Sequence, residues 1–195
     1  KLDNNYAKTK FFCEKLIKKN LKSFIIFRFF NVCSAMQINK KMFGELHNPE
    51  NHLIPTVITK ALLNKKIKIF GNNFNTPDRT TIRDYIHVKD ICIAIEKSIF
   101  FLIRKNTKNT FNLGTGKGYS IKNIIKETSK YLNKEVKFNY ALRRKGDKNR
   151  LVCNIDSVEK NLKWRPQNSN LRKIIFDEIK WIKYYSMYKK KRVFK

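Results

Sequence analysis

The chain has few cysteines and histidines, no long apolar run and only six glycines among 195 residues. Its four cysteines are too widely spaced for a zinc site or a disulfide framework, and none belongs to a C-x-x-C pair: Cys13, Cys33, Cys92 and Cys153. This pattern favours a reduced, cytoplasmic setting. No apolar stretch approaches the ~20 residues of a membrane span, so we expect no membrane partner.

The three histidines do not predict a metal centre. His47 and His87 have no carboxylate or further ligand at a spacing that would complete a metal-binding set with His52. We therefore expect no bound metal, and we assign His52 a hydrogen-bonding role without acid–base chemistry.

Acidic residues are scarce, with 15 Asp and Glu against 44 Lys and Arg and a net charge of +29. Such a charge favours nucleic acid or an anionic membrane as partner, because Lys and Arg neutralise phosphates. Here 34 of the basic residues are Lys, and Lys, Asn and Ile are abundant from end to end, which is typical of A/T-rich coding sequence. The even spread of charge also differs from the patch of a nucleic-acid binder. We expect no specific nucleic-acid partner, and a basic nucleic-acid-binding protein stays as an alternative.

Helical and strand patterns alternate along the chain, which predicts α/β architecture. Strands are expected at residues 23–30, 66–70, 110–113 and 136–140, the first of them buried on both faces of a parallel sheet. Helices are expected at residues 6–19, 55–64, 88–105, 121–132 and 170–188. Ser120 is a good N-cap, and the spacing of Asp156 and Glu159 predicts a capping box that opens a further short helix. Residues 31–54 are polar and predicted to be irregular.

Tyr6 and Lys10 form the first motif that carries chemistry. They are four residues apart, so on a helix their side chains share one face. A cation held beside a phenol stabilises the phenolate and favours loss of the proton. Tyr6 is therefore a candidate proton acceptor for a hydroxyl group.

Three further motifs follow in order: RDYIHV at residues 83–88, GTGKG at residues 114–118 and RRKGD at residues 143–147. Guanidinium groups bind phosphate through two parallel hydrogen bonds, so Arg83 and Arg144 are candidates for holding a diphosphate. Asp147 suits a vicinal diol, because a carboxylate can accept from two hydroxyls. The glycine run lacks the spacing of a dinucleotide fingerprint and is predicted to be a structural turn.

Together and in this order, the motifs resemble the C-terminal part of the UDP-glucose 4-epimerases, which are extended short-chain dehydrogenases/reductases, over roughly residues 4–185. The resemblance implies the C-terminal strands of an NAD-binding Rossmann fold plus a smaller mixed α/β substrate domain. Residues 1–33 would end the Rossmann domain and carry the catalytic helix. Residues 34–188 would form the UDP-sugar domain, interleaved with the last Rossmann segments, and residues 189–195 a basic tail. The N-terminal NAD-binding half is missing, so the chain alone is expected to be inactive.

The resemblance also gives individual residues their roles. Tyr6 and Lys10 would be catalytic and would contact the cofactor NAD together with Phe30. A UDP-sugar would be bound by seven side chains: Asn31, His52, Leu53, Phe70, Arg83, Arg144 and Asp147. Leu151 lies where the family gates sugar size, and the intact protein is expected to be a homodimer. Two positions depart from the family: residues 32–35 lack its usual glycine, and Arg79 replaces a common glycine and is expected to distort a turn.

The sequence thus predicts an NAD-dependent UDP-glucose/UDP-galactose 4-epimerase of the cytoplasm, which transiently oxidises carbon 4 of the sugar with Tyr6 as base. Besides a basic nucleic-acid-binding protein, two further alternatives stay open. The first is another nucleotide-sugar epimerase or dehydratase of the same family. The second is a UDP-sugar-binding remnant without activity.

Overall fold

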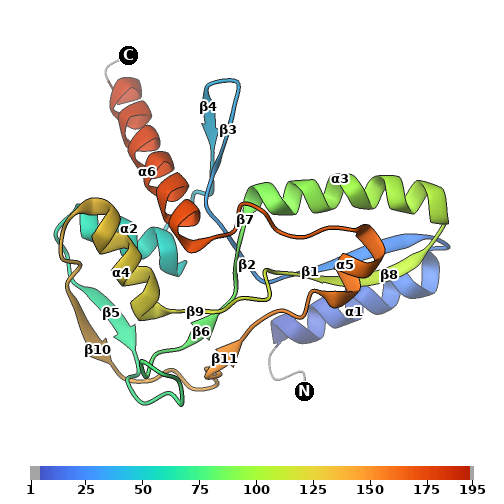
Figure 1. Ribbon diagram of the computed structural model, residues 1–195, viewed down its shortest axis with the longest axis horizontal. Coiled ribbons are helices and arrows are strands. Elements are labelled where there is room, and N and C mark those ends of the chain that lie inside the picture. Colours follow the sequence, from blue (N-terminus) through green and yellow to red (C-terminus); the bar gives the residue numbers. More distant parts are fainter. Residues whose placement is uncertain (1–4, 194–195) are drawn as a thin grey trace.

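The computed structural model describes residues 5–193, and its helices pack around small, mostly parallel sheets (Figure 1). The helices are α1 (Asn5–Asn20), α2 (Leu53–Leu62), α3 (Val88–Lys105), α4 (Ile121–Leu132), α5 (Asp156–Leu162) and α6 (Leu171–Val193). The longer strands are β1 (Phe24–Phe29), β5 (Ile67–Phe70), β8 (Lys108–Leu113) and β10 (Phe138–Ala141). The short strands are β2 (Asn31–Cys33), β3 (Met36–Ile38), β4 (Lys41–Phe43), β6 (Ile82–Arg83), β7 (Tyr85–His87), β9 (Tyr119–Ser120) and β11 (Arg150–Leu151). The predicted α/β architecture is confirmed.

The first core surrounds the parallel pair of β1 and β8, against which α1, α3 and α5 lie (Figure 1). Phe111 and Leu113 of β8 pack with Ile86, Ala94 and Trp164 in one buried cluster. Strand β1 was predicted to be buried on both faces, and this is wrong within the described residues. Only its first residue is buried, and Phe29 at its other end is 51% exposed, because β8 is its only paired strand there.

The second core lies between α2, α4 and α6 and the parallel pair of β5 and β10. Its fully buried members include Val57 and Ile58 of α2, Ile124 of α4 and Ile174 of α6. Helix α2 begins two residues before Pro55, the predicted start. Proline is tolerated there because backbone N–H groups in the first helical turn have no partner within the helix.

The segment predicted to be irregular, residues 31–54, contains three short strands. Strand β2 pairs in parallel with β7, and β3 and β4 form an antiparallel hairpin. Strands of three residues carry too short a pattern to be recognised from the sequence. Strand β6 joins β11 in parallel and β9 in antiparallel pairing, so the segments around residues 31, 84 and 151 lie side by side.

Helix ends test the capping predictions. The Ser120 hydroxyl accepts from the backbone N–H of Asn123, whose side chain accepts from Ser120 in return, so the predicted cap is confirmed. The predicted Asp156 capping box is wrong, because Asp156 is already the first residue of α5 and Ile155 precedes it without a side-chain cap. Helix α6 continues to Val193, so most of the predicted basic tail is helical backbone; residues 194 and 195 lie outside the described part.

Asp84 fixes the glycine-rich turn. Its buried carboxylate accepts from the backbone N–H of Thr115 at 2.9 Å, of Gly116 at 3.0 Å and of Cys153 at 3.1 Å. The Thr115 hydroxyl donates to it at 2.6 Å. A Cβ atom at Gly114 would lie 2.8 Å from the carboxylate and 2.4 Å from the Cys153 Cβ, so only glycine fits. The structural role predicted for this turn is confirmed.

We expect Asp84→Asn to lower the free energy of unfolding by roughly 2–4 kcal/mol, because an amide donor would face backbone donors and charge-assisted bonds would be lost. Urea unfolding measures the change. The control Asp156→Asn alters an exposed carboxylate and should stay within roughly 1 kcal/mol. Equal stability of the two variants would contradict the role of Asp84.

Candidate active site

A cleft of about 850 Å³ opens beyond the carboxyl end of β1, between α1, β2, the start of α2 and α6. It is lined by five residues to which the sequence gave roles: Tyr6, Phe30, Asn31, His52 and Leu53. They come from segments far apart in the chain. The carboxyl edge of parallel strands is the usual place for ligands in α/β proteins.

Tyr6 and Lys10 share one face of α1, as predicted from their spacing. The Lys10 Nζ lies 5.6 Å from the centre of the Tyr6 ring. Tyr6 is 73% exposed and lines the cleft, so its hydroxyl is accessible to a ligand.

Asn31 is held where β2 meets the RDYIHV motif. Its backbone N–H and its side-chain amide both donate to the Asp84 carbonyl oxygen, at 3.2 Å and 2.6 Å. Asn31 lies opposite Tyr85 in the register of β2 and β7, and Tyr85 also lines the cleft. These bonds bring the Asn31 side chain beside the backbone of the residue that follows Arg83.

The other four predicted substrate residues form two contacting pairs near the ends of β5 and β6. The Arg144 guanidinium stacks 3.8 Å above the Phe70 ring, and Arg83 lies 3.5 Å from the Asp147 carboxylate. Arg83 also donates to the carbonyl oxygens of Ile82 and Lys148, at 2.9 and 2.8 Å. Arg144 is exposed, so its guanidinium is the more accessible of the two.

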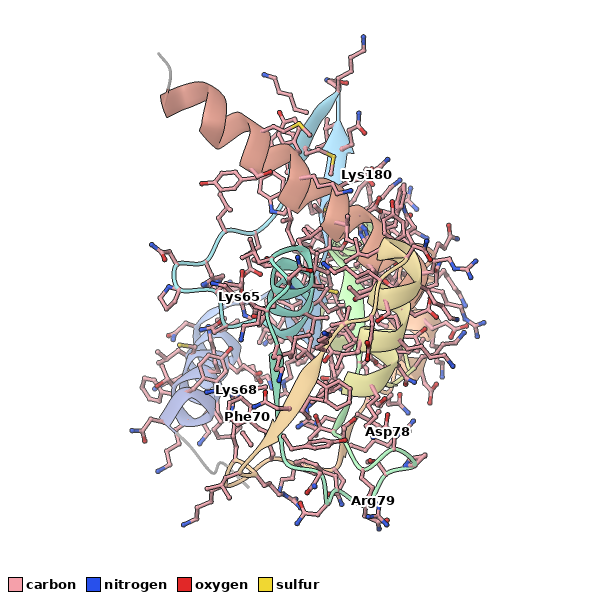
Figure 2. The ribbon with its side chains drawn as sticks, turned by 90° about the vertical axis from the view of Figure 1, so that its left-hand side faces the viewer. Lys65, Lys68, Phe70, Asp78, Arg79 and Lys180 are labelled. Atoms are coloured by element: carbon pink, nitrogen blue, oxygen red, sulfur yellow. The ribbon has the colours of Figure 1, made fainter. Side chains whose placement is uncertain are left out.

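The turn that follows β5 contains Asp78 and Arg79, which Figure 2 shows with Phe70 in the lower part of the molecule. The distortion expected from Arg79 does not occur. Arg79 adopts the left-handed conformation with φ of 63°, and Asp78 closes the turn by accepting from the backbone and hydroxyl of Thr80. The arginine thus fits the glycine position at a cost of about 1–2 kcal/mol of backbone strain.

Glu178 is a cleft residue that the sequence analysis missed. It is only 5% exposed, lies on α6 and accepts a hydrogen bond from the Ser34 backbone. Burial, reinforced by Glu50 and Glu45, raises the pKa of the Glu178 carboxyl to about 7. A signal was present in the sequence, because Glu178 follows Ile174 by four residues and therefore lies on the buried face of the helix.

Cys33 also lines the cleft, and its thiol donates to the Ile86 carbonyl oxygen at 3.5 Å. Burial raises the pKa of this thiol well above its ordinary value. A thiol held neutral is a poor nucleophile. Covalent chemistry at Cys33 is therefore not supported.

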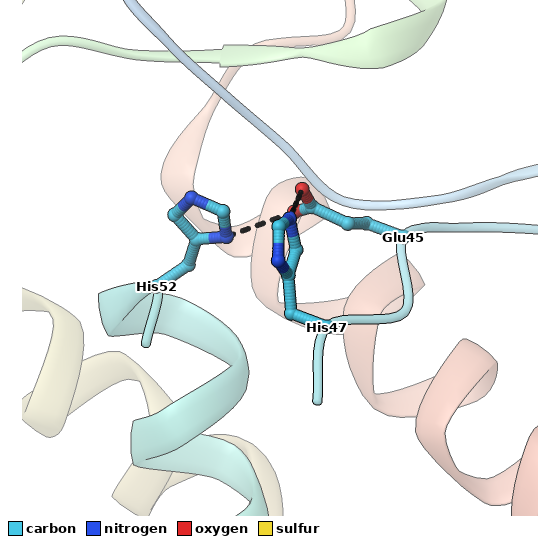
Figure 3. A group of neighbouring side chains, drawn as sticks. All are labelled: Glu45, His47 and His52. Carbon is cyan, nitrogen blue, oxygen red and sulfur yellow. Dashed lines mark ion pairs between the residues drawn. The ribbon is translucent and has the colours of Figure 1, made fainter. Parts of the chain in front are cut away.

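His52 is the N-cap of α2 at the edge of the cleft, and its Nδ1 lies 3.1 Å from the Glu45 carboxylate. His47 contacts the same carboxylate at 2.7 Å (Figure 3). The reason given for expecting no metal set, that no carboxylate has suitable spacing, is therefore wrong. His87 lies elsewhere, buried at the start of α3, where its Nδ1 accepts from the Lys89 backbone.

None of the helices between residues 5 and 193 combines the length and the apolar character that a membrane span requires.

The sequence matches a family model described as GDP-mannose 4,6 dehydratase over residues 3–175. The chain therefore belongs to this family, within the extended short-chain dehydrogenases/reductases.

Within the family the chain is similar to UDP-glucose 4-epimerases. It is 37% identical over 170 residues to the UDP-glucose 4-epimerase of Rhizobium meliloti (strain 1021), which covers 84% of this chain and 51% of that protein. A crystal structure of a UDP-glucose 4-epimerase matches at 38% identity with a TM-score of 0.86, over 93% of this chain and 56% of that chain. The crystal structure of the Stenotrophomonas maltophila UDP-glucose-4-epimerase, with bound NAD and formylated UDP-arabinopyranose, matches at 27% identity.

The Stenotrophomonas maltophila structure matches with a TM-score of 0.88, over 96% of this chain and 57% of that chain. The Rossmann-type fold predicted from the sequence is confirmed by these neighbours. The chain spans about half the length of the curated relatives it matches.

The raised pKa of Glu178 makes stability depend on pH. Between its ordinary pKa of 4.5 and about 7, the folded protein keeps a proton that the unfolded chain releases. The contribution of Glu178 to the free energy of unfolding therefore falls as pH rises through this window.

We expect Glu178→Gln to remove this fall, so the variant should gain up to about 3 kcal/mol relative to the unchanged chain between about pH 4.5 and 7. Urea unfolding of both proteins across this range measures the difference. The control Glu135→Gln alters an exposed carboxylate and should not reproduce this gain. A pH-independent difference for Glu178→Gln would exclude a protonated carboxyl in the folded state.

Proposed function

We propose that this chain is the UDP-sugar-binding and proton-transfer part of an NAD-dependent UDP-glucose/UDP-galactose 4-epimerase. The observation that carries the proposal is the single cleft that brings Tyr6 of α1 together with Asn31, His52 and Leu53. The sequence motifs assign the same residues to the sugar and the nucleotide. The similarity to UDP-glucose 4-epimerases supports the same assignment.

The residues that would contact NAD fit such a group. Phe30 and the exposed Tyr6 line the cleft next to the carboxyl end of β1, and Lys10 lies beside the Tyr6 ring. When bound, NAD would supply the hydride acceptor and donor for carbon 4 of the sugar. The crystal structure of the similar Stenotrophomonas maltophila enzyme contains bound NAD.

Tyr6 would accept the proton of the sugar 4-hydroxyl and later return it. Lys10 would hold positive charge near the phenolate, which stabilises the deprotonated form. The exposed position of Tyr6 lets a sugar hydroxyl approach its oxygen directly. Loss of this proton together with the carbon-4 hydride, for which NAD would be the acceptor, would leave a 4-keto sugar. This sugar would have to turn over before the hydride returns to its opposite face.

The nucleotide would stay fixed during this turn. Arg144 would bind the diphosphate with Asn31 and Arg83, while Asp147 would accept from the ribose hydroxyls and Phe70 would lie beside the base. Arg144 is positioned by its stack on Phe70, which leaves the edge of its guanidinium for phosphate.

Fewer residues bear on which sugar the chain would bind. Leu151, the proposed gate, pairs with Arg83 in the register of β11 and β6 and is 47% exposed. Its intermediate size suits several sugars, so another nucleotide-sugar epimerase or dehydratase is the second candidate. Three further predictions belong to this proposal: that the Rossmann domain ends at residue 33, that the intact protein is a homodimer, and that it works in the cytoplasm.

In the complete enzyme, we expect Tyr6→Phe to lower kcat by ~10²–10⁴-fold with little change in UDP-sugar affinity, because the proton acceptor acts mainly in the transition state. Steady-state epimerisation kinetics measure the effect. Tyr131→Phe is the control, because Tyr131 of α4 packs against Phe176 of α6 and is not among the cleft residues. Retention of more than about a tenth of the rate would remove Tyr6 from the mechanism.

We expect Arg144→Lys in the complete enzyme to weaken UDP binding by roughly 1–3 kcal/mol, although the net charge is unchanged, because bidentate geometry is lost. Arg143→Lys is a matched control: Arg143 also stacks on a phenylalanine, 4.0 Å from the Phe74 ring, but has no assigned role toward UDP. Calorimetric titration with UDP compares the variants.

The same variants test the basic-protein alternative. If the +29 charge serves nucleic acid, a random oligonucleotide should bind both Arg→Lys variants equally, with an affinity that falls steeply with salt. Equal UDP affinity of the Arg144 and Arg143 variants would exclude Arg144 from the site.

A further inference from the structure

Three side chains that offer metal-ligand atoms meet at the rim of the cleft: Glu45, His47 and His52. One oxygen of the Glu45 carboxylate lies 2.7 Å from the His47 Nε2, and the other lies 3.1 Å from the His52 Nδ1 (Figure 3). All three ligand atoms lie within 4.8 Å of one another. The carboxylate thus stands between two imidazole nitrogens that both face it.

The loop that carries these residues is anchored on both sides. The Glu45 carbonyl oxygen accepts from the Trp181 indole N–H at 2.9 Å. A Cβ atom at Gly44 would lie 2.6 Å from the same indole, so glycine permits this close approach. At the other side His52 is the N-cap of α2, and its backbone N–H donates to the Glu50 carboxylate at 2.8 Å. The ligand atoms therefore belong to a loop tied to α6 and α2.

The charge of the surroundings also favours a cation. The chain has only 15 acidic residues against 44 basic ones, yet three carboxylates gather here. Glu45 and Glu50 both contact His52, and their negative charges both raise the pKa of the buried Glu178 carboxyl. In a protein of net charge +29, this is a local concentration of negative charge.

We propose that Glu45, His47 and His52 bind a divalent first-row transition ion such as Zn²⁺. Two imidazole nitrogens and one carboxylate are a donor set that suits zinc, cobalt and iron, whereas magnesium and calcium prefer oxygen ligands. Bonds of about 2.0–2.2 Å around a tetrahedral ion place its ligands roughly 3.4 Å apart. The two Glu45–His separations, 2.7 and 3.1 Å, are somewhat shorter than this, and all three ligand atoms lie within 4.8 Å of one another, so small side-chain rotations complete the site.

The bound ion has at least one coordination position left for a water or an exogenous oxygen, because three protein ligands do not fill a tetrahedral shell. Glu45 and His52 line the cleft, so that position is close to the cleft. The site itself does not depend on the proposed epimerase activity, since the three ligands and the loop are sufficient for binding.

The test is titration of the folded 195-residue chain with Co²⁺, in a Cys13→Ser, Cys92→Ser background that removes the two exposed thiols. We expect saturable binding of one equivalent, with visible absorption bands of nitrogen and oxygen ligation and displacement by Zn²⁺. Glu45→Gln and His47→Ala should each weaken binding by at least the ~10–100-fold that changes around a metal site cost.

Matched controls are Glu135→Gln, an exposed carboxylate elsewhere, and Leu46→Ala, an exposed side chain between the two ligands. Both should bind Co²⁺ like the background chain, and far-UV circular dichroism should show the same helix content for all variants. Absence of binding, or equal binding by the ligand variants and the controls, would overturn the proposal. Because no sugar or NAD enters the titration, its outcome is independent of the epimerase assay.

Discussion

The buried carboxylate of Asp84 is the constraint on which the arrangement of the site depends. It accepts from the backbone N–H groups of Thr115 and Cys153, and thereby joins the glycine-rich turn to the segment after β11. Its own carbonyl oxygen accepts both amide bonds of Asn31. A buried charge is costly unless hydrogen bonds satisfy it, and here backbone N–H groups do so. Arg83 precedes Asp84 directly, so the hydrogen bonds of Asp84 also fix the backbone that carries Arg83.

His87 of the RDYIHV motif has a comparable structural role, whereas Arg83 is the residue of the motif to which the sequence assigned a ligand. The His87 backbone N–H donates to the Ser169 hydroxyl oxygen, and the His87 imidazole lies 3.1 Å from the Asp177 carboxylate of α6. Asp90, just inside α3, accepts from the backbone of Asn168 at 2.8 Å. These bonds fix the start of α6, the helix that carries Glu178 into the cleft. His87 of the motif and Asp90, two residues after it, therefore help to place α6 and Glu178 at the cleft.

Local patterns were predictable from the sequence, and long-range ones were not. The bounds of α3 and the Ser120 cap follow from helical periodicity and from a hydroxyl at the first turn, both of which are encoded within a few residues. The shared face of Tyr6 and Lys10 is local in the same sense. The partners of Asp84 lie 31 and 69 residues away, so no spacing rule reveals them. The predicted burial of β1 failed because a strand's composition does not say which neighbours cover it.

The distribution of charge favours one orientation of the proposed substrate. The carboxylates of Glu45 and Glu178 line the cleft, whereas Arg83, beside Asp147, and Arg144, stacked on Phe70, are not among the lining residues. A diphosphate is attracted by the guanidinium groups and repelled by the carboxylates. With a pKa of about 7, Glu178 is partly neutral near that pH, so the repulsion weakens as it takes up its proton. A cation held by Glu45 would reduce the repulsion further. The proposed nucleotide orientation and the proposed metal site are therefore electrostatically compatible.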